Sequence, residues 1–269
     1  MKEKITSQDI FKSTSVYYAR YRLGYPQELI SYLKKELTLD GTGTLLDLGC
    51  GTGQLALQLS PFFKDVDAVD ASSEMIDQGR VAAATKAILN INWYVQRAED
   101  INRLTNEAVL YDTVTIGNAF HHMDREVTLK LLDNLVKDHG CLVILYSGES
   151  LRNRNTPWKK RLAELIEKYV GEKEQVQKMI AIQEKKNDRE ILKQSTFSDV
   201  RYFQHTYPLV WTMDSILGHL YSTSYCSTEV LGNKKQDFEH ELRSELLKLN
   251  LSGNFEEDVT LEAYLARRS

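Results

Sequence analysis

The segment from residue 45 to residue 53, Leu-Leu-Asp-Leu-Gly-Cys-Gly-Thr-Gly, limits the possible folds of this chain more than any other feature. It joins an apolar run, Thr44–Leu48, that predicts a buried strand to a stretch, Gln54–Leu59, that predicts a short helix. Glycine tolerates a positive φ and lets the backbone approach a ligand, and open α/β sheets bind ligands where their strands end. We therefore predict a nucleotide-type site lined by three glycines, Gly49, Gly51 and Gly53.

Short β-rich runs alternate with helical patterns from residue 43 to residue 148, which is typical of βαβ units on a parallel sheet. After the first strand, this pattern predicts four more, over residues 66–70, 92–96, 112–116 and 142–146. A helix capped by Ser72 or Ser73 is expected to reach about Leu89, and another is expected over residues 124–137, before Gly140 turns the chain.

Beyond Gly148 the pattern changes to amphipathic helices. Apolar residues over 162–170 and 176–180 predict a two-helix insertion. A sixth strand is expected over residues 200–211, followed by a helix over 238–249 and a last strand over 259–265.

Composition excludes several classes of protein. Hydrophobic residues make up 42% of the chain and charged residues 27%, which supports a buried core and argues against disorder. The longest apolar run, Cys141–Tyr146, is far shorter than the roughly 18 residues that cross a bilayer. No signal-peptide pattern follows Met1, so we expect a cytoplasmic protein without a membrane partner. The three cysteines have no zinc-site spacing, and we expect no metal.

A net charge of -4 argues against a general attraction to nucleic acid. Residues 151–195 nevertheless contain 12 Lys or Arg and 7 Asp or Glu, a local charge of +5. This stretch is either a phosphate-binding patch or the solvated face of a helix.

The acid before the glycines indicates what kind of ligand the loop binds. A dinucleotide-binding loop prefers G-x-G-x-x-G, but here the third glycine comes one residue early and Asp47 precedes the loop. A carboxylate repels a pyrophosphate and suits an ammonium or sulfonium group. Asp70, at the end of the second strand, can accept both hydroxyls of a ribose, and Met75 can pack on an adenine face. The alternatives are that Asp70 is a helix cap and Met75 a core residue.

These motifs, together with Ala98-Glu-Asp100 and Tyr111-Asp-Thr-Val-Thr-Ile116, resemble those of the class I S-adenosylmethionine-dependent methyltransferases. The likeness is closest to the small-molecule branch of the ubiquinone-biosynthesis type and covers roughly residues 15–148. It implies an α/β, Rossmann-like fold with a seven-stranded, mostly parallel sheet, a last strand antiparallel to the rest, and a helical cap. Gln96-Arg97 departs from the Gly-Asp that this family often has there.

The resemblance also assigns roles within a site for S-adenosyl-L-methionine. The glycine loop would contact the methionine half, Asp70 the ribose, and Ala98 and Glu99 the adenine, and Asn118 would complete the cofactor site. Tyr18 and Arg22 would belong to a lid over the methionine carboxylate, although the same tyrosine-rich stretch also suits an amphipathic helix on the sheet edge. The implied division of the chain is a lid over 1–40, a cofactor-binding core over 41–150, an insertion over 151–198, and a part over 199–269 that completes the core.

Two histidines, His121 and His122, follow the fourth strand at the ligand edge and are the candidate catalytic bases. Alternatively, one caps the next helix and the other packs inside. We expect methylation of an oxygen or nitrogen atom of a small-molecule acceptor, of secondary metabolism, in a pocket roofed by the lid, the insertion and residues 211–225. The alternatives are an RNA methyltransferase, a non-catalytic cofactor-binding regulator and an NAD-dependent dehydrogenase. The pattern fits a monomer or a homodimer.

Overall fold

A computed structural model describes residues 7–103, 110–148, 151, 154–171 and 188–269. The chain forms two compact units, each assembled from three stretches of sequence. The sheet unit comprises residues 23–147, 183–205 and 260–269, and the helical unit comprises residues 1–22, 148–182 and 206–259.

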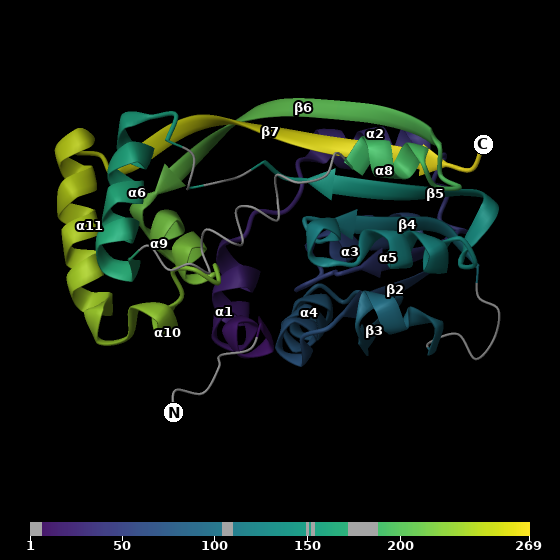
Figure 1. Cartoon of the computed structure of the whole chain (residues 1–269), viewed down its shortest axis with the longest axis horizontal. Helices are drawn as coiled ribbons and strands as arrows, with labels where there is room; N and C mark the ends of the chain where they lie inside the picture. Colours follow the sequence, from purple (N-terminus) through teal and green to yellow (C-terminus); the bar gives the residue numbers. More distant parts are fainter. Residues whose placement is uncertain (1–6, 104–109, 149–150, 152–153, 172–187) are drawn as a thin grey trace. The chain divides into compact units, whose positions relative to one another are not determined.

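One seven-stranded sheet has the strand order β3-β2-β1-β4-β5-β7-β6 (Figure 1). Strands β1 to β5 pair in parallel, whereas β7 is antiparallel to β5, with Leu142 opposite Ala266. This topology confirms the predicted fold class. The strands are β1 Thr44–Leu48, β2 Asp65–Asp70, β3 Ile91–Val95, β4 Tyr111–Gly117, β5 Val136–Tyr146, β6 Asp199–Thr212 and β7 Asn254–Arg267.

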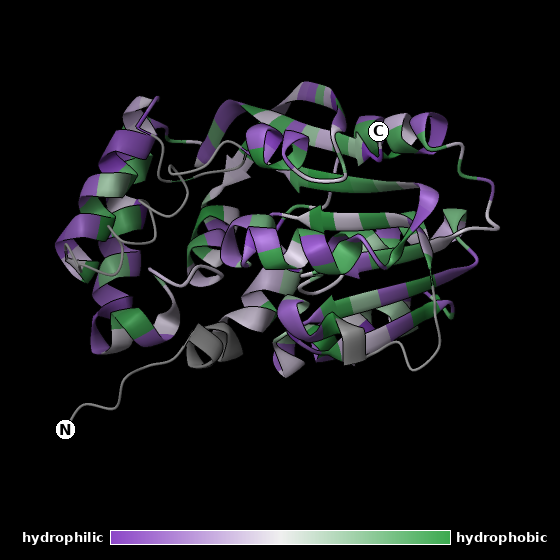
Figure 2. Ribbon diagram, turned by 45° about the vertical axis from the view of Figure 1, so that its right-hand side comes forward, coloured by the Kyte–Doolittle hydropathy of each residue, from purple (hydrophilic) through white to green (hydrophobic). Residues whose placement is uncertain are grey.

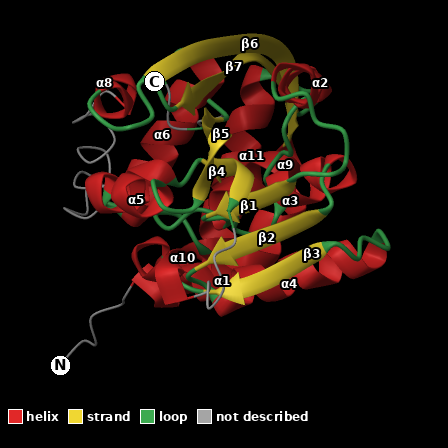
Figure 3. Ribbon diagram, turned by 90° about the vertical axis from the view of Figure 1, so that its right-hand side faces the viewer, coloured by secondary structure: helices red, strands yellow, loops and turns green. Residues whose placement is uncertain are grey.

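Helices cover both faces of the sheet within the sheet unit: α5 and α8 lie on one side of the strands, and α2 and α3 on the other (Figure 3). On the α5 side, apolar side chains of the strands share one core with Ile101, Leu132, Leu192 and Phe197. The helical segments of this unit are α2 Gln27–Glu36, α3 Gln54–Leu59, η1 Ser60–Phe62, α4 Ser73–Thr85, η2 Ala98–Arg103, η3 Phe120–His122, α5 Arg125–Leu132 and α8 Asp188–Lys193.

Two helix ends differ from the prediction. Helix α4 stops at Thr85 instead of Leu89, because Ala87 adopts a φ of 54° and closes the last turn. Helix α5 stops at Leu132, and β5 begins as early as Val136, so Gly140 lies inside a strand and does not turn the chain. A Cβ on Gly140 would lie 2.6 Å from Val136 Cγ1, so this glycine allows a close approach within the irregular start of β5.

The helical unit has a second core, which contains Trp158, Leu162, Trp211, Phe238 and Leu242. The helices carry both green, hydrophobic residues and purple, hydrophilic residues, which is the amphipathic pattern expected of helices that pack on this core (Figure 2). The second helix predicted for the insertion lies outside the described residues. The described helices here are α1 Ser7–Tyr21, α6 Pro157–Val170, α9 Met213–Tyr221, α10 Thr228–Leu231, η4 Gly232–Lys234 and α11 Lys235–Leu249.

A buried ion pair joins α6 to β7 inside the helical unit. The Lys159 ammonium donates to the Glu257 carboxylate, and these side chains are only 1% and 4% exposed. The indole N–H of Trp211 donates to the other carboxylate oxygen of Glu257. A buried charge needs such partners, since an isolated one is strongly disfavoured.

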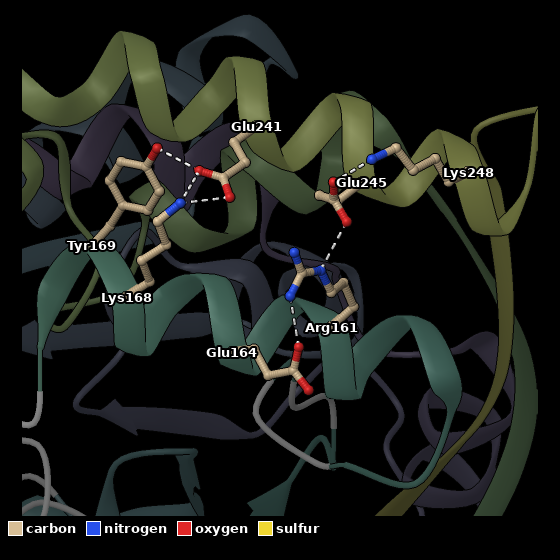
Figure 4. Close-up of polar contacts among 7 residues, drawn as sticks. All are labelled: Arg161, Glu164, Lys168, Tyr169, Glu241, Glu245 and Lys248. Atoms are coloured by element: carbon tan, nitrogen blue, oxygen red, sulfur yellow. Dashed lines mark hydrogen bonds and ion pairs between the residues drawn. The ribbon is translucent and has the colours of Figure 1, made fainter.

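Acidic residues on α11 pair with two cations of the insertion, Arg161 and Lys168 (Figure 4). Arg161 Nε lies 3.0 Å from a Glu245 oxygen, and Lys168 Nζ lies 2.6 Å from a Glu241 oxygen. Arg161 and Lys168 are therefore already paired with carboxylates, which argues against a phosphate-binding patch at these two residues. Of the helices described, none is long and apolar enough to cross a membrane.

Candidate functional site

The glycine loop follows β1 and has a backbone that only glycine adopts readily. Gly49, Gly51 and Gly53 have φ values of 69°, 55° and 79°. A Cβ on Gly53 would lie 2.4 Å from Trp93 Cη2, and a Cβ on Gly49 would lie 2.6 Å from the Cβ of Ala119. The loop is therefore held against β3 on one side and against the segment after β4 on the other.

Four N–H groups of this loop donate hydrogen bonds to atoms of the protein itself. Those of Gly49 and Cys50 donate to the Val69 carbonyl at 2.8 and 3.0 Å, and that of Gly53 donates to the Cys50 carbonyl at 2.9 Å. The Gly51 N–H donates to Asp70 Oδ2 at 2.9 Å. A phosphate-binding loop instead points its N–H groups at the ligand. This arrangement favours a ligand that does not depend on those donors.

Asp47 fixes the base of the loop. Its side chain is only 1% exposed and accepts hydrogen bonds from the Thr115 hydroxyl at 2.7 Å and the Ala56 N–H at 3.1 Å. These contacts tie β1 to β4 and to α3. Burial raises the pKa of the Asp47 carboxyl to about 7, with a smaller contribution in the same direction from the Asp70 charge. A direct contact with a ligand remains a prediction.

Asp70 anchors the loop from the end of β2. Besides accepting from Gly51, its carboxylate accepts the Ser72 N–H at 2.9 Å, and burial raises its pKa. The Ser72 hydroxyl, and not Asp70, caps α4 by accepting the Met75 N–H at 3.3 Å, as the sequence predicted for one of the two serines. Each oxygen of Asp70 receives one of these hydrogen bonds and has a second lone pair for a ligand hydroxyl.

The residues assigned to adenine come from two elements: Met75 lies in α4, and Ala98 and Glu99 begin η2. Met75 and Ala98 are buried, at 4% and 8% exposed. Glu99 accepts the Asp124 N–H at 3.2 Å and pairs with Arg97 at 3.3 Å, and these partners lower its pKa against the effect of burial. Arg97, which departs from the family pattern, therefore has a local partner.

Asn118 links the ends of β4 and β5. It adopts a φ of 53°, donates from Nδ2 to the Ser147 hydroxyl at 2.8 Å and accepts the Ser147 N–H at 2.9 Å. A non-glycine residue in this conformation is uncommon and often marks a functional turn. Asn118 thus fixes the strand ends at the ligand edge.

His121 and His122 form the short helix η3, with ring centroids 4.0 Å apart. Burial, with help from His122 and Arg125, lowers the pKa of His121 to about 4, so its imidazole is neutral at pH 7. Its Nδ1 atom is buried and has no hydrogen-bond partner in the described structure. The alternative that a histidine caps the next helix is wrong, because Asp124 caps α5 by accepting the Val127 N–H at 3.1 Å.

The two residues assigned to the lid belong to the helical unit. Arg22 Nε donates to the Ser222 hydroxyl at 2.9 Å, and its guanidinium lies 5.1 Å from the centre of the Tyr18 ring. Their contact with a methionine carboxylate remains a prediction. His219, from the segment expected to roof the acceptor, is buried beside Trp211 in the same unit.

Sequence reasoning missed Gln54 and the group formed by Arg125, Tyr146 and Asp188. Gln54 Nε2 is a buried donor without a hydrogen-bond partner in the described structure. Its position directly after the third glycine was an available signal. No local pattern links Tyr146 to Asp188, which lies 42 residues further along the chain.

A cavity of about 600 Å³ opens at the opposite edge of the sheet, where the strands begin. Its lining includes Gly43, Asp112, Lys137 and Arg267. None of the predicted site residues lines it, so it is separate from the glycine-loop site.

Comparisons with known proteins find methyltransferases among the proteins that this chain resembles. Residues 45–140 match a family model described as a methyltransferase domain. An uncharacterized methyltransferase of Schizosaccharomyces pombe is 30% identical over 162 residues, which are 60% of this chain and 60% of that protein. A ubiquinone biosynthesis O-methyltransferase of Coxiella burnetii is 33% identical over 114 residues, 42% of this chain and 47% of that one. The chain therefore spans only about half to three fifths of these relatives.

A solved structure supports the same fold over the whole length. Phosphoethanolamine N-methyltransferase 2 of Haemonchus contortus, in complex with phosphomonomethylethanolamine and S-adenosylhomocysteine, aligns with a TM-score of 0.58 at 15% identity. The alignment covers 100% of this chain and 61% of that one. This likeness supports the Rossmann-like fold, and residues 45–140 are the part of the chain that resembles a methyltransferase domain.

Proposed function

We propose that this protein transfers a methyl group from S-adenosylmethionine to an oxygen or nitrogen atom of a small molecule. The observation that carries the proposal is the glycine loop, whose Gly49, Gly51 and Gly53 N–H groups are all donated within the protein. Two carboxyl groups, Asp47 and Asp70, support this loop. With these N–H groups already used, the loop lacks the free donors that a pyrophosphate needs, and the Asp70 carboxylate beside it favours the cationic methionine half of the cofactor.

The residues present fit the cofactor. Asp70 would bind the ribose hydroxyls through its second lone pairs, while Met75, Ala98 and Glu99 would surround the adenine. The loop and Asn118 would border the methionine half, whose carboxylate would satisfy the buried Gln54 Nε2.

The cofactor supplies a methyl group already activated on a sulfonium, so the protein has mainly to orient the acceptor and exclude water. A neutral His121 can take up a proton that the acceptor loses. A small-molecule acceptor is supported by the relative named for O-methylation in ubiquinone biosynthesis and by the structural neighbour with a phosphomonomethylethanolamine ligand. The pairing of Arg161 and Lys168 with acids on α11 speaks against RNA.

Calorimetry with S-adenosylmethionine, S-adenosylhomocysteine and NAD tests the cofactor site directly. We expect the two adenosyl compounds to bind and NAD not to bind. Asp70→Ala is expected to lower cofactor affinity by about 1–3 kcal/mol, or about 5- to 150-fold, because hydrogen bonds to a charged group are lost. Asp65→Ala, at the exposed start of the same strand, is the matched control. Tight NAD binding, or equal affinities of the two variants, would refute the assignment.

A further inference from the structure

Three side chains that the cofactor site does not use form a buried cluster at the ligand edge of the sheet unit. Arg125 begins α5, Tyr146 ends β5, and Asp188 begins α8. Arg125 Nη1 lies 3.0 Å from Asp188 Oδ1, and the Tyr146 hydroxyl donates to Asp188 Oδ2. The side chains of Arg125 and Asp188 are only 10% and 9% exposed.

This cluster is electrically neutral as a whole, because the guanidinium and the carboxylate carry opposite charges and face each other. Removing such a pair from water costs about as much free energy as the attraction returns, so the pair is not explained by stability alone. The Arg125 guanidinium also lies 5.6 Å from the centre of the Phe120 ring, which belongs to the same short helix as the two histidines. The cluster therefore fixes the segment that carries His121.

His121 lies beside the cluster and has an unfilled hydrogen-bonding atom. Its ring centroid is 6.2 Å from that of Tyr146, and its buried Nδ1 has no hydrogen-bond partner in the described structure. A buried nitrogen without a partner is costly unless a ligand or water supplies one. The carboxyl ends of β4 and β5, which flank this atom, form the edge where open α/β sheets bind ligands.

We propose that His121 Nδ1 is the contact atom of an acceptor subsite, and that this subsite takes an uncharged molecule with a hydroxyl group. Arg125, Tyr146 and Asp188 are the positioning residues of the subsite. This inference rests on the proposed methyl transfer and names its acceptor class. A carboxylate or an ammonium group on the acceptor would find Arg125 and Asp188 already paired with each other. A hydroxyl needs neither charge and can donate its proton to the imidazole nitrogen.

The step balances with the groups named. The hydroxyl oxygen forms a bond to the methyl carbon while the carbon–sulfur bond breaks, and the electron pair of that bond stays on sulfur. The hydroxyl proton passes to His121 Nδ1 and then to solvent. The imidazole is neutral before the step, which leaves one ring nitrogen able to accept a proton.

A panel of phenol, benzoate and benzylamine, each tested with S-adenosylmethionine and the full-length protein, compares the three acceptor classes. The kcat/KM for methyl transfer to phenol is expected to be at least about 100-fold higher than that for benzoate or benzylamine. In parallel, NMR with S-adenosylhomocysteine present follows the His121 imidazole signals, which are expected to move on addition of phenol only. Preference for benzoate or benzylamine, or His121 signals that respond to none of the three, overturns the proposal.

Variants separate the role of His121 from that of its neighbours. His121→Gln is expected to lower kcat for phenol by about 10²- to 10⁴-fold, the usual range for a lost general base, with the cofactor Kd unchanged. His139→Gln, on an exposed residue at the other edge of the sheet, is the control. If His121→Gln is as active as the control, the assignment of His121 is overturned. If the unmodified protein does not bind the cofactor, the proposed function is refuted instead.

The positioning residues are tested through the titration of His121. The groups that act on its ring are His122 from η3, Arg125 from α5 and Tyr146 from β5, and Asp188 from α8 pairs with Arg125 and Tyr146. Arg125→Gln removes a cation, so the pKa of His121 measured by NMR is expected to rise, and Arg125→Lys is expected to restore it. Tyr146→Phe is expected to lower kcat more than it changes the cofactor Kd. Unchanged His121 titration and unchanged kcat in these variants would overturn the positioning role.

Discussion

Replacing Asp47 with asparagine tests whether the glycine loop rests on a protonated carboxyl group. The pKa of Asp47 is about 7 in the folded protein, against 3.8 for an ordinary aspartate. The folded protein therefore keeps a proton that the unfolded chain releases above about pH 4. Stability must then fall as pH rises from about 4 to 7, and above that range the folded protein carries a buried anion.

The magnitude follows from the size of the shift. A change of about three pKa units corresponds to about 4 kcal/mol, of which about 2–3 kcal/mol is lost between pH 5 and pH 8. An asparagine side chain at this position does not titrate, and its amide can still accept the Ala56 N–H and donate to the Thr115 hydroxyl. We therefore expect the free energy of unfolding of Asp47→Asn to rise by about 2–3 kcal/mol relative to that of the wild type between pH 5 and pH 8.

Urea denaturation at four pH values between 5 and 8 measures the difference, with Asp65→Asn as a control on an exposed carboxylate. The control is expected to follow the wild type at every pH. If the stability of Asp47→Asn follows the wild type in parallel, or falls relative to the wild type as pH rises, Asp47 is charged in the folded protein and the reasoning fails.

Two further perturbations test the packing. Gly53→Ala is expected to lower the free energy of unfolding by about 2–4 kcal/mol, because its Cβ would overlap the Trp93 ring and its φ is positive. Gly41 also has a positive φ, 88°, but nothing lies within 4 Å of its Cβ position, so Gly41→Ala should cost only about 1 kcal/mol. Thermal denaturation compares them, and equal costs would refute the role of the Trp93 contact. Glu257→Gln is expected to cost about 3–5 kcal/mol in urea denaturation, because it leaves the Lys159 charge buried without its counter-ion. A cost below about 1 kcal/mol would refute this role of the ion pair.

The elements that local patterns specify were predicted well. Apolar runs located the first five strands to within a few residues, apart from the early start of β5, and the serine before α4 is its cap. These features depend on neighbours in the sequence. The turn assigned to Gly140 was wrong because the glycine is required by a side chain and two carbonyls next to it in space, and no sequence pattern distinguishes that need from a turn.

Contacts between distant residues account for most of what the sequence did not reveal. Asp47 was recognised as important, but its partner Thr115 is 68 residues away, so its burial and raised pKa could not be foreseen. Asp188 was missed for the same reason. Its neighbours in the chain form a short helix of ordinary composition, and only the folded sheet unit brings it to Arg125 and Tyr146.

The threading of the chain limits how this protein can diversify. Each unit is made of three separate stretches, and both β6 and β7 contribute residues to both units. Gene recombination exchanges contiguous pieces, so a crossover at any single position would graft only a fragment of the helical unit onto a related protein. New binding preferences are therefore expected to arise by point substitution or by lengthening of surface connections. An engineer who wishes to exchange the helical unit must redesign several junctions together.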